Sequence, residues 1–194
     1  MFEQMKNAGK RALLALVVST GLAASPAMSA VISFNPTTVN TAVGSTTAIE
    51  VRIAGLAAGQ DLGAFDINVL FDASQLSLAS YTLGNGLGDL AAFDAFEFSA
   101  GAIAAGVFNL AEVSFLADLG VQADAFTLAT LNFTSLHHGA SVLSFGGVAL
   151  GDAFGNAVTA DTVNATVTAI PEPASVYLML SALALMGLTR RARK

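Results

Sequence analysis

The chain has 194 residues, a formal net charge of −6 and no cysteine, which is the length of one domain with additional segments. Between residues 31 and 170 there are twelve Asp and Glu residues and one base, Arg52, a net charge of −11 with histidine neutral. This acidic middle excludes nucleic-acid binding, because phosphate contacts need Lys and Arg. The absence of cysteine excludes disulfides and thiolate metal sites.

The first thirty residues are typical of a secretory signal peptide. A basic head is followed by an apolar run at 12–18 and by small residues from 23 to 30. This order predicts removal of residues 1–30 by signal peptidase. The residues of the predicted cleavage region are Ala27, Ser29 and Ala30, with the cut after Ser29 or Ala30.

Residues 31–168 are predicted to form an all-β domain. Apolar and polar residues alternate, as they do in half-buried strands, at 49–53, 65–71, 113–115, 129–133 and 163–167. Shorter apolar runs at 31–34, 93–98, 103–108 and 142–145 are further strand candidates. Because Gly-rich turns separate these segments and no long helical stripe occurs among them, the pattern predicts a sandwich or barrel of eight or nine strands.

Three details of this domain are predicted from side-chain phase and composition. Most of the phenylalanines are expected to point inward, since the core has neither tryptophan nor disulfide. Phe126 and Leu128 are out of phase with Leu131 and Phe133, so either both faces of this strand are buried or a bulge lies near Ala129. The Gly- and Ala-rich stretch 83–106 is expected to have little regular structure.

The C-terminus has the order of a membrane anchor. Pro171, Glu172 and Pro173 precede an uncharged stretch at 174–189, whose length is near the lower limit for a membrane-spanning helix. A basic stop-transfer cluster follows, formed by Arg190, Arg191, Arg193 and Lys194. The positive-inside bias predicts that this cluster stays in the cytoplasm while the acidic domain lies across the inner membrane.

Residues 169–194 resemble the PEP-CTERM sorting signal of Gram-negative bacteria. The resemblance rests on the Pro171–Pro173 tripeptide, the apolar segment and the basic cluster in this order at the chain end. It implies that an exosortase recognises the tripeptide and processes the protein during its passage through the inner membrane. It also implies delivery to the cell surface or extracellular matrix and an association with exopolysaccharide. The same tail is also called an ice-binding protein C-terminal domain.

The middle resembles a cohesin-type domain, whose fold is a nine-stranded antiparallel jelly-roll β-sandwich shared with some carbohydrate-binding modules. The segments that carry the resemblance are 43–53, 63–76 and 126–145. They are packing motifs, so they support the fold more than a function. Cohesins bind dockerins, and the resemblance therefore implies a protein-binding module as one possible activity.

Few residues have the pattern of a metal or ligand site. Asp152, Asn156 and Asp161 are calcium candidates because calcium takes six to eight oxygen ligands, although a turn held by local hydrogen bonds is the favoured explanation for the first two. His137 and His138 are expected in a solvated loop. Four polar residues at period two form a candidate row for ice or polysaccharide, or an ordinary solvent face: Thr162, Asn164, Thr166 and Thr168.

No catalytic constellation is visible in the sequence. There is no Gly-x-Ser-x-Gly elbow and no cysteine, and Asp94 with Glu97 is the nearest carboxylate pair. We therefore expect a non-enzyme without a cofactor. Three functions stay open: an adhesion or scaffold protein of the surface or matrix, a carbohydrate-binding module for exopolysaccharide, and a cohesin-type module for another surface protein.

Overall fold

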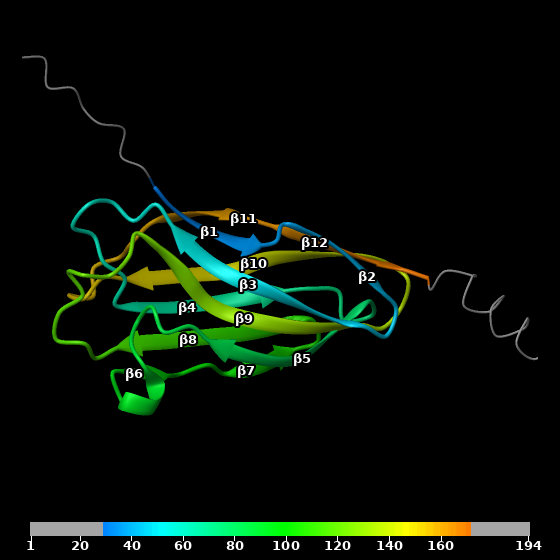
Figure 1. Cartoon of the computed structure of the whole chain (residues 1–194), viewed down its shortest axis with the longest axis horizontal. Coiled ribbons are helices and arrows are strands. Elements are labelled where there is room, and N and C mark those ends of the chain that lie inside the picture. The colour runs from blue at the N-terminus through cyan, green and yellow to red at the C-terminus, as the bar shows by residue number, and fades with distance from the viewer. Residues whose placement is uncertain (1–28, 172–194) are drawn as a thin grey trace, which may run out of the picture.

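Two β-sheets face each other in residues 29–171, the part of the chain that the computed structural model describes (Figure 1). The five-stranded sheet has the order β11 (Ala160–Val163), β1 (Ala30–Asn35), β3 (Thr46–Ala54), β9 (Ala125–Ser135) and β5 (Leu76–Leu83). The seven-stranded sheet has the order β2 (Thr38–Ala42), β12 (Ala165–Ile170), β10 (Gly139–Gly151), β4 (Ala64–Leu70), β8 (Val107–Ser114) and β6 (Ala95–Glu97), with β7 (Gly101–Ala104) also paired to β8. These two layers confirm the predicted β-sandwich.

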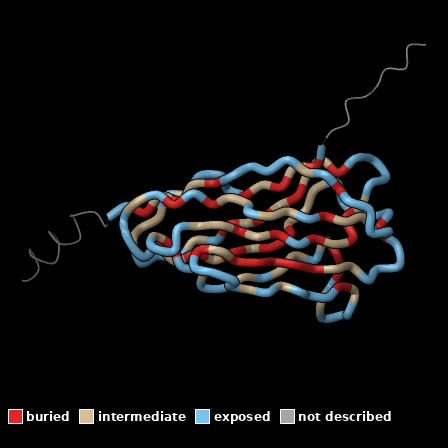
Figure 2. Tube along the Cα trace, turned by 180° about the vertical axis from the view of Figure 1, so that it is seen from behind, coloured by how far each residue is buried: buried red, intermediate tan, exposed pale blue. Residues whose placement is uncertain are grey.

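The core lies between the sheets and is built from the alternating stripes of the sequence. Ile49, Val51 and Ile53 of β3 are fully buried, and Ile67 and Val69 of β4 are buried in the opposite sheet. Their polar neighbours point away from the core because successive side chains of a strand face opposite sides. Figure 2 shows this alternation of buried and exposed positions along the strands.

The described residues contain twelve strands, whereas the sequence predicts eight or nine. Two of them, β2 and β5, lie outside the expected strands, and the expected strand at 163–167 is divided between β11 and β12. The chain changes sheet between β1 and β2 at Asn35-Pro36, and again between β11 and β12 at Asn164. The separate apolar runs at 93–98 and 103–108 contain β6 and the end of β7, which pair with different parts of β8. The short β6 and β7, with the 3-10 turn η1 (Leu90–Ala92), agree with the expectation of little regular structure at 83–106.

A bulge accounts for the phase change in β9. Val51 pairs with Ala129 and Arg52 pairs with Thr127, so Leu128 is the additional residue on β9. Leu128 is buried, as are Leu131 and Phe133 further along the strand. Of the two alternatives that the sequence leaves open, the bulge near Ala129 is confirmed.

The crossover at Asn164 contradicts the expected continuous strand at 163–167. Val163 is 41% exposed at the end of β11, whereas Ala165 is buried at the start of β12 in the other sheet. Thr162 therefore lies in the five-stranded sheet, and Thr166 and Thr168 lie in the seven-stranded sheet. The four polar residues do not form one row.

Most of the phenylalanines within residues 29–171 belong to the core or pack against it, as expected, but a defined subset does not. Phe34, Phe65, Phe108 and Phe133 are buried. Five others are exposed by 41% or more: Phe93, Phe96, Phe98, Phe115 and Phe154. Phe115 follows the last residue of β8, so the strand expected at 113–115 ends at Ser114 and Phe115 is exposed beyond it.

Four loops gather at one end of the sandwich, which we call the loop end. They are residues 55–63, 84–94, 115–124 and 152–159. The register places the strand termini that flank them together, since Ala64 pairs with both Val113 and Gly151. Residue 171 lies at the opposite end, where Ile170 pairs with Ala42 and Ala169 pairs with Gly139. Figure 1 shows the two ends on opposite sides of the molecule.

The predicted signal peptide and membrane anchor lie almost wholly outside the described residues. Of the named residues, Ala27, Glu172, Pro173 and the basic cluster 190–194 fall outside, whereas Ser29, Ala30 and Pro171 fall inside. No helix within residues 29–171 is long and apolar enough to cross a bilayer. The cleavage and anchor predictions therefore remain predictions.

The contrast between buried and exposed phenylalanines yields a matched test of this core. Phe133 is fully buried and its ring packs edge-on against Phe71 at 5.1 Å, whereas Phe154 is 88% exposed. We expect Phe133→Ala to lower the free energy of unfolding of residues 30–171 by about 3–5 kcal/mol because it leaves a cavity. Phe154→Ala is expected to change it by about 0.5 kcal/mol or less. Urea unfolding of the two variants measures both values, and equal losses would contradict the assigned core.

Candidate functional site

The side chain of Gln122 holds three elements of the loop end together. Its Oε1 accepts a hydrogen bond from the amide of Leu62 at 2.7 Å. Its Nε2 donates to the carbonyl of Leu62 at 3.0 Å and to the carbonyl of Gly86 at 2.9 Å. Because Gln122, Leu62 and Gly86 belong to three different loops, one amide group fixes their relative positions.

Two further hydrogen bonds reinforce this network, and the first of them adds the fourth loop. The amide of Ala153 donates to Oδ1 of Asp61 at 2.8 Å, which joins loop 152–159 to loop 55–63. The amide of Phe115 donates to the carbonyl of Asp94 at 2.7 Å, which joins loop 115–124 to loop 84–94. The four loops are thus connected by hydrogen bonds into one surface.

Three exposed rings, Phe93, Phe96 and Phe115, form what we call the phenylalanine cluster at the edge of the loop end. The ring of Phe96 contacts that of Phe115 edge-on, with centroids 4.9 Å apart, and lies 6.2 Å from that of Phe93 at a tilt of 38°. The rings are 72%, 41% and 62% exposed in chain order. Exposed apolar patches of this kind mark interaction surfaces.

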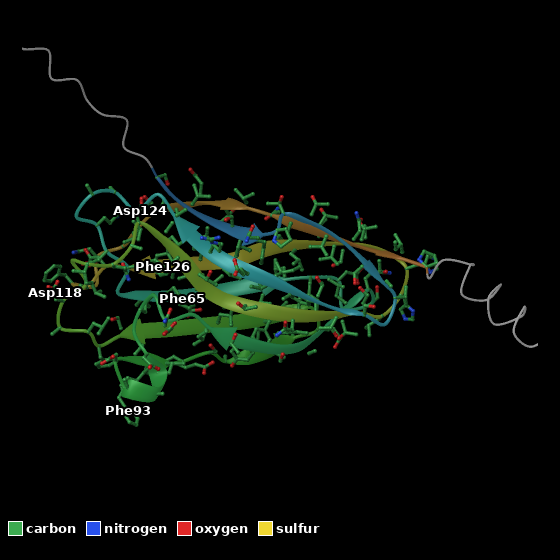
Figure 3. All side chains as sticks on the ribbon, in the orientation of Figure 1. Phe65, Phe93, Asp118, Asp124 and Phe126 are labelled. Carbon is green, nitrogen blue, oxygen red and sulfur yellow. The ribbon has the colours of Figure 1, made fainter. Side chains whose placement is uncertain are left out.

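The loop end is also acidic. Six of the twelve acidic residues of the domain lie in its four loops, and no Lys, Arg or His does. They are Asp61, Asp89, Asp94, Asp118, Asp124 and Asp152. Figure 3 labels Phe93, Asp118 and Asp124 at this end, with Phe65 and Phe126 beside them. The domain's single base, Arg52, lies instead on β3, with its guanidinium 3.8 Å from the carboxylate of Glu50.

Two carboxyl groups face each other just behind the phenylalanine cluster. Glu97 of β6 pairs directly with Glu112 of β8. Glu112 is 1% exposed and its Oε1 has no hydrogen-bond partner, whereas Glu97 is exposed and accepts a 2.6 Å hydrogen bond from the Tyr81 hydroxyl. The strand pairing therefore brings together a buried and an exposed carboxyl, rather than Asp94 and Glu97, the nearest pair in the sequence.

The environment of this pair changes its proton affinity. Burial raises the pKa of Glu112 to about 7, and the nearby Glu97 carboxylate adds to this effect. The hydrogen bond to Glu97, with some burial, raises the pKa of Tyr81. Desolvation and like charge both disfavour an ionised Glu112, so a large share of the folded molecules holds this carboxyl neutral at neutral pH.

A polar network lies on the outer face of the seven-stranded sheet. Nδ2 of Asn109 donates to Oδ1 of Asp66 at 2.6 Å and to Oδ1 of Asn68 at 3.0 Å. Oδ1 of Asn109 accepts from the amide of Ala100 at 2.9 Å. Asp66 is thus on an outward face, as the alternation of β4 predicts, and its network fixes the segment between β6 and β7.

The calcium candidates of the sequence lie in two different elements. Asp152 and Asn156 form a turn in which Oδ1 of Asp152 accepts from the amides of Phe154 and Asn156, both at 2.8 Å. The side-chain hydrogen bond from Asn156 lowers the pKa of Asp152. Asp161 lies on β11. Within residues 29–171 no group of three or more His, Asp or Glu residues is arranged to hold a metal ion.

The remaining sequence candidates are placed individually. His137 and His138 are exposed in the loop before Gly139, as predicted. Asp72 follows the end of β4, and hydrogen bonds from the hydroxyl and amide of Ser74 lower its pKa. Pro171 is exposed. The features missed from the sequence are Glu112, whose inward direction follows from its phase with Leu110, and the loop end, whose parts are far apart in the chain.

Gln122 provides a direct test of the loop network. Gln122→Ala removes three hydrogen bonds and leaves a buried amide and carbonyl unpaired, so we expect a loss of about 1–3 kcal/mol in unfolding free energy. Hydrogen exchange at the Leu62 amide should accelerate. Gln60→Ala is the matched control, because Gln60 accepts only one 3.3 Å bond within its own loop. Equal exchange at Leu62 in both variants would contradict the assigned role.

Glu112 predicts an unusual dependence of stability on pH. Its pKa rises from 4.5 to about 7 on folding, so the folded state binds more protons than the unfolded state between these values. Stability is therefore lost as the pH rises through this range, by about 3 kcal/mol. We expect Glu112→Gln to equal the wild type near pH 4 and to exceed it by this amount at pH 8. Urea unfolding across pH measures the difference, and Glu50→Gln, on an exposed face, should show no such gain.

Comparisons with known proteins agree with this architecture. The sixth cohesin of scaffoldin B from Acetivibrio cellulolyticus, solved with a Cel5 dockerin, matches with a TM-score of 0.61 at 19% identity, over 74% of this chain and 100% of that one. The cohesin module of a family 33 glycoside hydrolase from Clostridium perfringens matches with 0.59 at 19% identity, over 74% and 97%. A non-cellulosomal cohesin from Archaeoglobus fulgidus matches with 0.59 at 13% identity, over 77% and 97%.

In the sequence, residues 169–194 match the family described as the PEP-CTERM protein-sorting motif. No curated protein matches the chain. Both resemblances read from the sequence are therefore confirmed, the tail by its motif and the domain by its fold. The chain carries a PEP-CTERM protein-sorting motif behind a domain of the cohesin fold.

Proposed function

We propose that this protein is an exported, non-catalytic surface or matrix protein, which an exosortase sorts and whose domain binds another protein. The observation that carries the proposal is the joining of a sorting motif at 169–194 to a cohesin-fold domain. The motif supports export and passage through the inner membrane. The fold supports a binding module. An association with exopolysaccharide is suggested only by the sorting motif, and nothing in the domain adds to it.

Protein binding by the domain is favoured over sugar binding. The scaffoldin B cohesin was solved in complex with a dockerin, so this fold is suited to presenting a surface to another protein. For sugar binding, coplanar aromatic rings would be required as a platform. The phenylalanine cluster has interplanar angles of 38° and 71°, and Tyr81 packs edge-on against Phe108 with its hydroxyl bonded to Glu97.

The position of the tail also suits display of the domain. Residue 171 leaves the sandwich at the end opposite to the loop end. If the tail is held at a membrane or surface, the four loops point away from it, toward partners in the surrounding space. The domain's charge of −11 keeps it soluble and suits basic partners.

The sorting half of the proposal is tested by producing the full chain in a host with an exosortase and in one without. We expect loss of the segment after Pro171-Glu172-Pro173 only in the first host, with product at the surface or in the matrix. Intact-mass analysis of each cell fraction measures both effects. Glu172→Ala should abolish processing, whereas Asp124→Ala, an exposed acid in the domain, should leave it unchanged.

An intact tail in the inner membrane of both hosts would contradict exosortase sorting. The tail would then be a simple anchor. Retention of the tail-less domain at the envelope in the usual amount would also contradict a sorting role for the tail.

A further inference from the structure

Three of the four loops expose large apolar side chains that the core does not use. At the loop end the exposed fractions are 90% for Val121, 88% for Phe154, 72% for Phe93, 62% for Phe115 and 39% for Leu116. None of them belongs to the core cluster or packs against it. Keeping such groups in water is unfavourable, so their concentration at one end needs an explanation outside the fold.

Two hollows lie next to these exposed side chains. One, of about 340 Å3, is lined by Leu116, Val121 and Phe126 among others. Another, of about 220 Å3, lies between the loop 115–124 and Ala153. Both are bordered by Leu116 and Leu119, so they flank a single loop. Each is large enough to receive an apolar side chain of a partner.

The surface is also pre-organised. Gln122 and Asp61 connect all the loops that border the hollows by hydrogen bonds of 2.7–3.0 Å. A partner therefore does not have to order these loops on binding, which lowers the entropic cost of association.

The charge of the loop end indicates which kind of partner can bind there. Six Asp residues without one base in the loops repel an anionic bilayer. A second copy docked by the same end would place the same carboxylates against each other. The exposed rings lie at 38° and 71° to one another, which does not offer a flat face to a sugar chain. A protein that combines apolar side chains with Lys and Arg can cover the exposed apolar groups and also neutralise the charge of the Asp residues.

We infer that the loop end is the docking surface for a protein segment that carries apolar side chains among Lys and Arg residues. This inference rests on the proposed protein-binding function and specifies its surface and partner. The partner's apolar side chains enter the hollows beside Leu116 and contact Phe115, Val121 and Phe154. Its basic groups lie near Asp118 and Asp124, which belong to the same loop.

The test uses the full chain reconstituted in phosphatidylcholine nanodiscs and an immobilised synthetic helical peptide with Leu on one face and Lys on the other. The loop variant combines Phe115→Ser, Val121→Ser and Phe154→Ser, which leaves the charge unchanged. The matched control combines Leu136→Ser, Val142→Ser and Val163→Ser, which are 41–54% exposed outside the loop end. Thermal unfolding confirms that both variants are folded.

We expect the loop variant to bind the peptide about tenfold more weakly than the wild type, and the control to stay within about twofold. Added salt should weaken wild-type binding, because the Asp–Lys attraction is screened. Peptides in which Leu is replaced by Ser, or Lys by Glu, should bind about tenfold more weakly than the original.

Equal binding of the peptide by the loop variant and the wild type would overturn the inference and leave protein binding at another surface intact. Absence of peptide binding to the wild type would overturn it as well. So would binding to phosphatidylglycerol vesicles or purified exopolysaccharide that the loop variant alone loses. An intact tail in both hosts of the exosortase experiment would instead contradict the proposed sorting function, without changing these outcomes.

Discussion

Apolar contact between the inner faces of the two sheets is the interaction on which the rest of the structure depends. The chain has no cysteine to form a disulfide, and within residues 29–171 a single ion pair joins Arg52 to Glu50 on an exposed face, where such pairs contribute little. Stability therefore rests on stripes such as Ile49, Val51 and Ile53 packed against the opposite sheet. Because this core fixes the strand ends, it also fixes where the four loops meet.

The parts of this core that the sequence predicts are those where side-chain phase alone decides direction. The stripes of β3 and β4 are read correctly because each strand is regular and has a polar outer face. The prediction fails at Asn164, because the chain changes sheet there and Val163 no longer shares a buried face with Ala165 and Val167. It also fails for Phe115, since hydrophobicity does not show whether an aromatic residue lies in a strand or just beyond its end.

The candidate surface lay beyond sequence reasoning for a different physical reason. The sorting tail is readable because its tripeptide, apolar stretch and basic cluster follow one another in the chain. The loop end joins residues that are up to about a hundred positions apart, such as Asp61 and Ala153, and only the sheet register brings them together. Likewise, Glu97 meets Glu112 through the pairing of β6 with β8. A carboxyl buried without a partner is visible only once its neighbours are known.

In the proposed docking, charge and apolar area at the loop end have different roles. The six Asp residues attract a basic partner over a range of roughly 8–10 Å at physiological salt, which raises the rate of encounter. The exposed side chains of Phe115, Val121 and Phe154 act only at contact, where water is removed, and they govern how long the partner stays. An acidic protein without these apolar groups would associate faster with a basic partner, but the complex would not last longer. The hydrogen bonds of Gln122 make the second step efficient, because the loops are already ordered when the partner arrives.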